Sequence, residues 1–230
     1  QAEDGIRDAQ ESRGLGDVYK RQFHYSMPYS ADDGTGLGKS LKSILQADPS
    51  IKIYTASITP KGLETSAEVA DGVFPIWMSP EKSEVLMSSI QKGLDKGGKT
   101  MMDFDVAPFV TVVMGDDVDH CRMPIKGSMA LYIGGMGARE NNFYNDYAKA
   151  LGYEEAAVKI QDLFLAGKKD EAMAAVPDEL VDACHLVGPA GRIKERLQVW
   201  KEAGNSGKIG SMLLGAGQME ALELVAGELL

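Results

Sequence analysis

Short runs of β-branched and aromatic residues alternate with amphipathic helical segments along most of the chain. Four runs have the composition of buried strands, at residues 51–58, 73–78, 104–114 and 208–214. Each run is followed by a turn and then by a segment with apolar residues at helical spacing. Strands that alternate with helices form parallel βαβ units, so the pattern predicts an α/β fold with a parallel sheet.

Capping residues mark where the predicted helices begin and end. Helices are predicted over 62–72, from Ser79-Pro80 to Gly97-Gly98, after Gly115-Asp116-Asp117, over 190–204 and over 218–230, with Gly72 ending the first. From residue 140 to residue 175 the pattern is helical almost throughout, with breaks at 152–153 and 167. This stretch is interpreted as a helical insertion. The pattern alone favours neither a (β/α)₈ barrel nor an open doubly wound sheet.

Composition narrows the possible functions. A net charge of −10 and a pI near 4.8 argue against a nucleic-acid partner, which clustered Lys and Arg would bind. No apolar run reaches the roughly 18 residues that span a bilayer, so no membrane segment is predicted. Cys121 and Cys184 form no paired motif, which suits a reducing cytoplasm, and three scattered histidines give no support for a metal site.

The first 22 residues differ from the rest of the chain. They have no apolar period, and residues 1–8 and 12–22 can be back-translated into strings that resemble a sequencing flow-cell primer and a transposase adapter. Residues 9–11 fall where a sample barcode would stand. We therefore predict that 1–22 is a non-native adapter-like tail without a packed element. The natural domain is then expected to occupy 23–230 and to lack its own amino-terminal part.

Three stretches carry a resemblance to a known family. They are "IYTASITPKGLETSAEVADG", "LYIGGMGARENNFYNDYAKALGYE" and "VPDELVDACHLVGPAGRIKERLQVWKEAG". Together they resemble the luciferase-like flavin and deazaflavin oxidoreductases, and most closely the subgroup that uses the deazaflavin coenzyme F-420. The resemblance implies the second half of a (β/α)₈ TIM barrel, strands five to eight, with a helical insertion after strand seven.

The same resemblance implies an activity. The expected reaction is hydride transfer with coenzyme F-420 on an unknown small-molecule substrate, in a cytoplasmic enzyme that is a homo-oligomer when full length. One alternative is an FMN-dependent monooxygenase, and another is a non-catalytic phosphoanion-binding fragment. The resemblance places the ring pocket largely in the missing half, so no catalytic residue is assigned. Half a barrel leaves strand edges unpaired, and the fragment alone is expected to be inactive and to dimerise, to aggregate or to bind cofactor only feebly.

Candidate cofactor contacts follow from the resemblance together with local chemistry. The loop Ala56-Ser57-Ile58-Thr59-Pro60-Lys61-Gly62 is implied to hold the cofactor phosphate, because it combines a helix N-terminus with two hydroxyls and a cation. The alternative is an ordinary capped helix. Trp77 and Met78 end a predicted strand and either touch a ring or pack in the core.

Two candidates follow the Gly-rich stretch 134–138. Arg139 and Asn142 are candidate anion or amide contacts, although the stretch lacks the features of a nucleotide motif, and its glycines equally suit tight helix packing. His185 is interpreted as structural.

Overall fold

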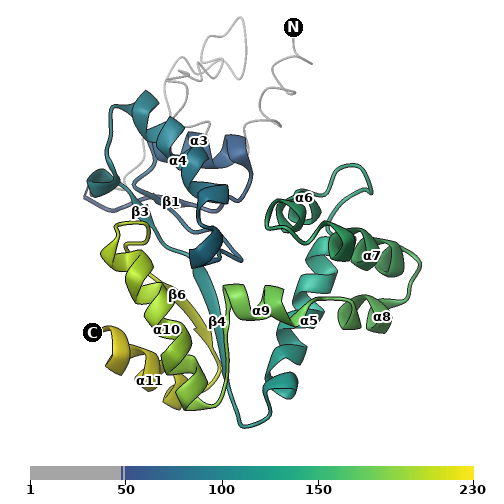
Figure 1. Ribbon diagram of the computed structural model, residues 1–230. Helices are drawn as coiled ribbons and strands as arrows, with labels where there is room; N and C mark the ends of the chain where they lie inside the picture. The colour runs from purple at the N-terminus through teal and green to yellow at the C-terminus, as the bar shows by residue number, and fades with distance from the viewer. Residues whose placement is uncertain (1–47, 49) are drawn as a thin grey trace, which may run out of the picture.

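Two three-stranded, entirely parallel sheets form the centre of the fold in the computed structural model, which describes residue 48 and residues 50–230 (Figure 1). The first sheet has the order β1 (Tyr54–Thr55), β2 (Gly72–Val73) and β3 (Asp105–Val106). The second has the order β5 (Leu186–Gly188), β4 (Phe109–Met114) and β6 (Leu213–Ala216). The predicted α/β class with parallel strands is confirmed. The adapter-like tail predicted over 1–22 lies outside the described residues.

The two sheets are joined where β3 leads into β4. Pro108 interrupts the strand predicted over 104–114, because a proline has no N–H to donate to the ladder. After the interruption, Phe109 N donates to the Pro75 carbonyl at 3.0 Å, and Phe109 forms a parallel bridge with Ile76. The residues after β2 therefore run beside the start of β4, which brings the carboxyl end of the first sheet next to the second.

The remaining strand predictions were wrong in length or position. The strands predicted over 51–58 and 73–78 shorten to two residues each, at β1 and β2. The strand predicted over 208–214 begins only at Leu213, which pairs with Phe109, and β5 was not predicted. A run of apolar residues shows that a segment is buried, but pairing depends on where a partner strand lies, and this information is not local.

Gly72 was expected to end the first helix and instead belongs to β2. The helix, α3 (Pro60–Val69), ends at Ala70 in extended conformation. A Cβ on Gly72 would lie 2.5 Å from a ring carbon of Tyr54 and 2.7 Å from the Asp105 carbonyl. Glycine is therefore required here because the side chains and backbone of both neighbouring strands approach closely.

Helix α4 (Glu84–Gly97) packs tightly on α3. Its predicted stop is confirmed, since Gly98 has φ 64° and its N–H bonds back to Leu94 and Asp95. The predicted start was wrong, because Ser79 and Pro80 begin a 3₁₀ turn (Pro80–Lys82) and the α-helix starts only after Ser83. A second 3₁₀ turn, Met101–Asp103, leads into β3.

The helical stretch predicted over 140–175 is confirmed, including both of its breaks, and the helices between β4 and β5 are called the helical insertion below. Asp117 caps α5 (Val118–Gly135) by accepting the His120 N–H, and α6 (Phe143–Ala150), α7 (Glu154–Leu165), α8 (Lys169–Ala174) and α9 (Asp178–Cys184) follow. Figure 1 shows α6, α7 and α8 gathered around α5, apart from α10 and α11. A Cβ on Gly134 would lie 2.8 Å from the Phe164 ring, so this glycine allows α5 and α7 to pack closely.

Helix α11 (Met219–Leu229) packs on β4 and β6, and helix α10 (Ala190–Asn205) packs on β5 and on α11 (Figure 1). Proline 189 precedes the first turn of α10, as predicted. Ion pairs join the insertion to α10, because Asp182 in α9 accepts from Arg122 of α5 at 2.6 Å and from Arg192 of α10 at 2.7 Å. Among the helices of the described region, none is long and apolar enough to cross a membrane.

Candidate functional site

A cavity of about 330 Å³ opens where β1 ends and α3 begins, and we call it the loop cavity. Residues from three chain segments line it: Ala56, Ser57, Ile58, Thr59, Phe74, Ile76, Phe143 and Tyr144. The first four belong to the predicted cofactor loop. The structure adds two residues after β2 and two aromatic residues at the start of α6, which the sequence did not assign to a site.

Thr59 and Gly62 set the conformation of the loop. Thr59 is the N-cap of α3, and its Oγ1 accepts the Gly62 N–H at 3.2 Å while its carbonyl accepts the Leu63 N–H at 2.9 Å. A Cβ on Gly62 would lie 2.8 Å from Thr59 Oγ1, 3.2 Å from Ser57 Cβ and closer still to Ser57 Oγ. The absence of a side chain at Gly62 therefore lets both hydroxyls fold over the helix N-terminus.

The charge on this loop lies at its outer side. The Lys61 side chain is 70% exposed, and its Nζ lies 3.0 Å from Glu64 Oε1, which also pairs with Lys96. Two lysines share one carboxylate, so the start of α3 keeps a net positive charge in an acidic protein. The positive end of the helix dipole adds to it. An anion placed over this turn would be stabilised by both.

A second cavity, the aromatic cavity, has a volume of about 320 Å³ and shares Ile76 and Tyr144 with the loop cavity. Its lining residues are Ile76, Trp77, Phe109, Thr111, Val113, Pro124, Ile125, Ser128, Tyr132, Tyr144 and His185. Three aromatic rings meet here. The ring centroid of Trp77 lies 6.0 Å from that of Tyr132 and 5.7 Å from that of Tyr144, and the centroids of Tyr132 and Tyr144 are 4.8 Å apart. The two perpendicular contacts have the geometry that aromatic pairs favour.

Trp77 has a strained backbone. Its φ of 52° lies in the left-handed region, which costs a bulky residue on the order of 1 to 3 kcal/mol. Two buried donors hold it in place, because the Trp77 carbonyl accepts from the Tyr147 hydroxyl at 3.2 Å and from the Cys184 thiol at 3.1 Å. Burial raises the pKa of Cys184 to about 12, so this thiol serves as a donor and not as a nucleophile.

His185 is buried against β4, as its structural interpretation requires. Its Nδ1 accepts the backbone N–H of Thr111 at 3.1 Å, and burial lowers the pKa of the ring to about 4. The imidazole is therefore neutral near pH 7. Since Nδ1 is the acceptor, Nε2 carries the proton, and Nε2 has no partner among the described residues.

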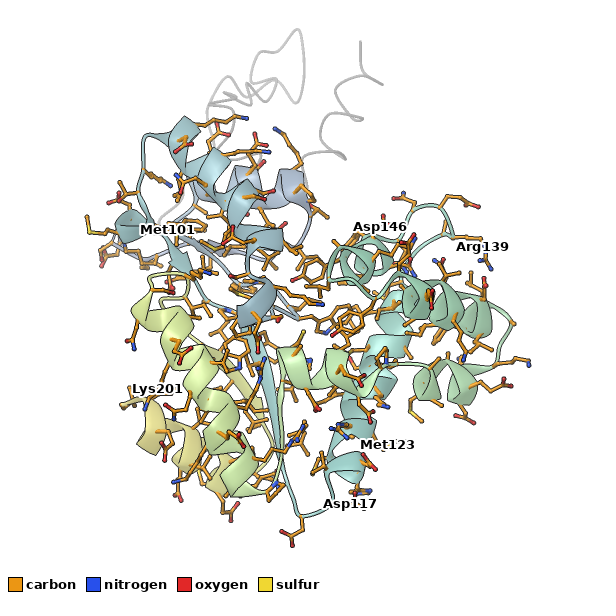
Figure 2. The ribbon with its side chains drawn as sticks, viewed as in Figure 1. Met101, Asp117, Met123, Arg139, Asp146 and Lys201 are labelled. Carbon is orange, nitrogen blue, oxygen red and sulfur yellow. The ribbon has the colours of Figure 1, made fainter. Side chains whose placement is uncertain are left out.

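Arg139 and Asn142 do not line either cavity. Arg139 is half-exposed and pairs with Asp162, at the outer margin of the insertion in Figure 2. Asn142 is buried and caps α6, accepting from the backbone N–H groups of Tyr144 and Asn145, while its amide donates to the carbonyls of residues 132 and 133. All four bonds are internal, so the side chain joins α5 to α6. Cofactor contacts by these two residues stay predictions.

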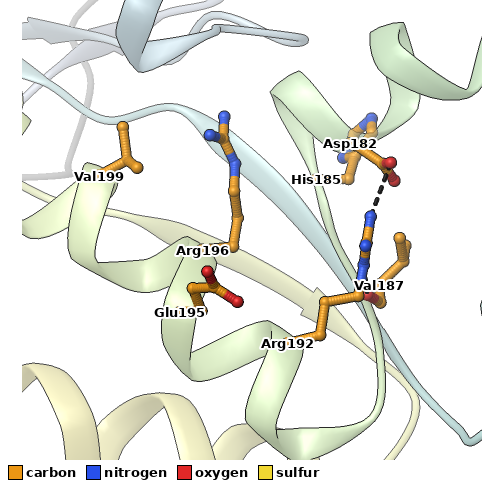
Figure 3. Close-up of a pocket in the computed structure, with 7 residues that line it drawn as sticks. All are labelled: Asp182, His185, Val187, Arg192, Glu195, Arg196 and Val199. Carbon is orange, nitrogen blue, oxygen red and sulfur yellow. Dashed lines mark hydrogen bonds and ion pairs between the residues drawn. The ribbon is translucent and has the colours of Figure 1, made fainter.

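A third cavity, of about 320 Å³, lies between α9 and α10 and is drawn in Figure 3. We call it the charged groove, because Asp182, Arg192, Glu195 and Arg196 line it together with two valines and His185. Asp182 pairs with Arg192 at 2.7 Å, and Arg196 donates to Glu81 and to the Ala183 carbonyl. These pairs brace α9 against α10. No three His, Cys, Asp or Glu side chains within the described residues cluster as metal ligands do.

Comparison with known proteins identifies the family. The profile described as luciferase-like monooxygenase matches residues 29–207. The chain belongs to the luciferase-like monooxygenase family. A relative from Mycobacterium tuberculosis, provisionally named a coenzyme F-420-dependent oxidoreductase, is 36% identical over 208 residues, which are 88% of this chain and 58% of the relative. The 5,10-methylenetetrahydromethanopterin reductase of Archaeoglobus fulgidus is 24% identical and aligns over 79% of this chain and 54% of its own.

The fold resembles that of a solved enzyme structure, over about as much of this chain as the sequence comparisons cover. The coenzyme F-420-dependent tetrahydromethanopterin reductase of Methanopyrus kandleri superposes with a TM-score of 0.59 at 21% identity, over 78% of this chain and 50% of that enzyme. At that identity the likeness concerns the fold alone. The chain thus spans somewhat more than half the length of the curated relatives it matches.

Proposed function

We propose that this chain is the second half of a (β/α)₈ barrel, strands five to eight, from an enzyme that transfers hydride with coenzyme F-420. Family membership, the relative whose name carries that coenzyme and the parallel arrangement of β1, β2, β4 and β6 support the proposal. The deazaflavin supplies the hydride chemistry, and the protein binds and orients it.

The loop cavity is the observation on which the assignment of a cofactor site rests. Ser57 and Thr59 line it with hydroxyls at the positive end of α3, and Lys61 lies in the first turn of that helix at the surface. Phosphate oxygens suit this combination of hydroxyls, helix N-terminus and cation. In this proposal the segment Ala56-Ser57-Ile58-Thr59-Pro60-Lys61-Gly62 holds the cofactor phosphate, and Trp77 lies toward the ring.

FMN remains the alternative cofactor, because its phosphate would use the same loop and the family profile is described as a monooxygenase. In this proposal the loop contacts only the phosphate, so it does not distinguish the flavin ring from the deazaflavin ring. A phosphoanion-binding fragment without catalysis is the alternative from another class. We further propose a small-molecule substrate, a cytoplasmic location and a homo-oligomeric full-length enzyme, of which this fragment alone is inactive.

Titration of the purified chain with F-420 and separately with FMN, followed by cofactor fluorescence, tests the assignment. Thr59→Val removes the loop hydroxyl while keeping the side-chain shape. Thr65→Val is the matched control on the exposed side of α3, where its Oγ1 bonds, among the described residues, only to the Lys61 carbonyl. Loss of one hydrogen bond to a phosphate costs roughly 1.5 kcal/mol, so Thr59→Val is expected to weaken F-420 binding about tenfold.

The control is expected to bind as the wild type does. Equal affinities for all three proteins would return the loop to the role of an ordinary helix cap. Tighter binding of FMN than of F-420 would select the monooxygenase alternative. Competition by inorganic phosphate without any binding of either ring would select the phosphoanion-binding fragment.

A further inference from the structure

The aromatic cavity has walls without charge. Among the described residues that line it there is no Lys, Arg, Asp or Glu, although such residues make up 25% of the sequence. The nearby charged groove shows that the fold does place paired charges in cavities elsewhere. A charged ligand in the aromatic cavity would lose its hydration without gaining a partner, which costs several kcal/mol. The cavity therefore selects against ions.

Its shape and lining favour a flat apolar body. Trp77 and Tyr132 meet at an interplanar angle of 84°, Tyr132 and Tyr144 at 79°, and Phe109 from β4 adds a ring that is 41% exposed. Perpendicular aromatic walls present both faces and edges to a planar ligand. A volume of about 320 Å³ holds a single substituted ring with room to spare.

One buried donor lies between this cavity and the charged groove, because His185 lines both. His185 is 4% exposed, and its Nε2–H has no partner among the described residues, whereas its Nδ1 is fixed by the Thr111 N–H. An unpaired buried donor is unfavourable until an acceptor reaches it. Because the ring is neutral, the donor suits a neutral acceptor such as a carbonyl oxygen.

We propose that the aromatic cavity binds an uncharged, planar carbonyl compound whose oxygen accepts from His185 Nε2–H while its body lies against Trp77, Tyr132 and Tyr144. Since Ile76 and Tyr144 also line the loop cavity, this ligand would lie beside the cofactor. Its role as substrate rests on the proposed function. In that role the reduced deazaflavin, held by the loop of residues 56–62, would supply hydride to the carbonyl carbon while His185 Nε2–H holds the oxygen, and water would supply the proton of the resulting alcohol.

Binding of three probes to the cofactor-free chain tests the proposal. Acetophenone has one carbonyl oxygen, benzoate has the same ring with a charge, and ethylbenzene has no acceptor. Trp77 fluorescence reports binding in a Trp200→Phe background, since Trp200 is buried and its Nε1 has no hydrogen-bond partner within the described part of the chain. Acetophenone is expected to bind at least tenfold more tightly than benzoate and threefold to tenfold more tightly than ethylbenzene.

Two variants sharpen the result. His185→Asn keeps a side-chain acceptor for the Thr111 N–H and removes the Nε2–H, so acetophenone is expected to lose its advantage over ethylbenzene. Ser128→Lys adds a cation on the exposed wall of α5, and it is expected to raise benzoate affinity at least fivefold with less than a twofold change for acetophenone. Met123→Lys is the control, because Met123 is an exposed residue of the same helix that does not line the cavity (Figure 2).

Benzoate binding as tight as acetophenone binding would overturn the proposal, and so would the absence of a Trp77 response to all three probes. A Ser128→Lys variant indistinguishable from Met123→Lys would also contradict it. A parallel titration with F-420 separates the two hypotheses. Acetophenone binding without binding of F-420 sustains the cavity assignment and counts against the proposed phosphate loop. F-420 binding without acetophenone binding overturns the cavity assignment and leaves the proposed loop supported.

Discussion

Gly62→Ala is the substitution most specific for the loop cavity. The added methyl would lie 2.8 Å from Thr59 Oγ1 and 3.2 Å from Ser57 Cβ, and closer to Ser57 Oγ, where ordinary contacts exceed roughly 3.4 Å. The hydroxyls of Ser57 and Thr59 must therefore rotate or move away from the helix N-terminus. The perturbation is confined to the two side chains that the proposed function assigns to phosphate binding.

The effect on stability is expected to be small, whereas the effect on binding is large. Alanine in place of glycine within a helix gains about 1 kcal/mol, and loss of the Thr59 cap costs about the same, so the free energy of unfolding stays within about 1 kcal/mol of the wild type. Two displaced hydrogen bonds to a phosphate are worth about 1.5 kcal/mol each. F-420 binding is then expected to weaken by a factor of about 100.

The assay pairs a thermal unfolding curve with an F-420 fluorescence titration on each variant. Gly191→Ala is the matched control, because Gly191 also lies in the first turn of a helix and an added Cβ there would meet nothing within 4 Å. It is expected to leave F-420 affinity unchanged. If Gly62→Ala bound F-420 as tightly as Gly191→Ala does, neither hydroxyl would hold the cofactor, and the reasoning from the loop geometry would be wrong.

Three further outcomes are expected. Lys61→Ala should weaken F-420 binding about tenfold at low salt and less at high salt, because Lys61 is exposed and shares Glu64 with Lys96. Gly93→Ala should lower the melting temperature by roughly 2 to 12 °C, because its Cβ would lie 2.7 Å from Ala67 Cβ and force α3 and α4 apart at a cost of about 1 to 3 kcal/mol. Denaturant titrations should show the free energy of unfolding falling by about 3 kcal/mol from pH 6.5 to pH 4. Over this range His185 takes up a proton in the unfolded chain, whereas in the folded chain it stays largely neutral because burial lowers its pKa to about 4. His185→Asn should flatten that pH dependence.

Helices were predictable because their signals are local. The Asp117 cap, the Gly98 stop and both breaks of the insertion are where the sequence indicated them. Strand limits were not predictable to the same degree. Gly72 has the residue type and position of a helix stop. It is instead a strand residue, and glycine is needed there because Tyr54 and Asp105 approach from the neighbouring strands. These contacts depend on the assembled sheet.

Only the part of the site that is formed by consecutive residues could be predicted from the sequence. The segment from Ala56 to Gly62 was assigned from the family resemblance together with its place between a strand and a helix, and its first four residues line a cavity. Phe143 and Tyr144 join it from some 85 residues away, and no periodicity could indicate that meeting. The stretch "NNFYN" at residues 141–145 contains the residues that reach the cavity, but Asn142 was predicted as the contact. Asn142 instead caps the helix, and the two aromatic residues after it line the cavity.

The insertion contributes to the site in a way that explains the strain at Trp77. The left-handed backbone of Trp77 turns its ring toward Tyr132 and Tyr144, both of which belong to the insertion, and the Tyr147 hydroxyl and Cys184 thiol fix the same peptide from α6 and α9. Two hydrogen bonds of about 1 kcal/mol each offset a strain of comparable size. The carboxyl end of β2 therefore adopts this conformation only while α6 and α9 are packed against it. A ligand between Trp77 and Tyr144 would bridge the strand and the insertion, so its binding and the docking of the insertion must stabilise each other.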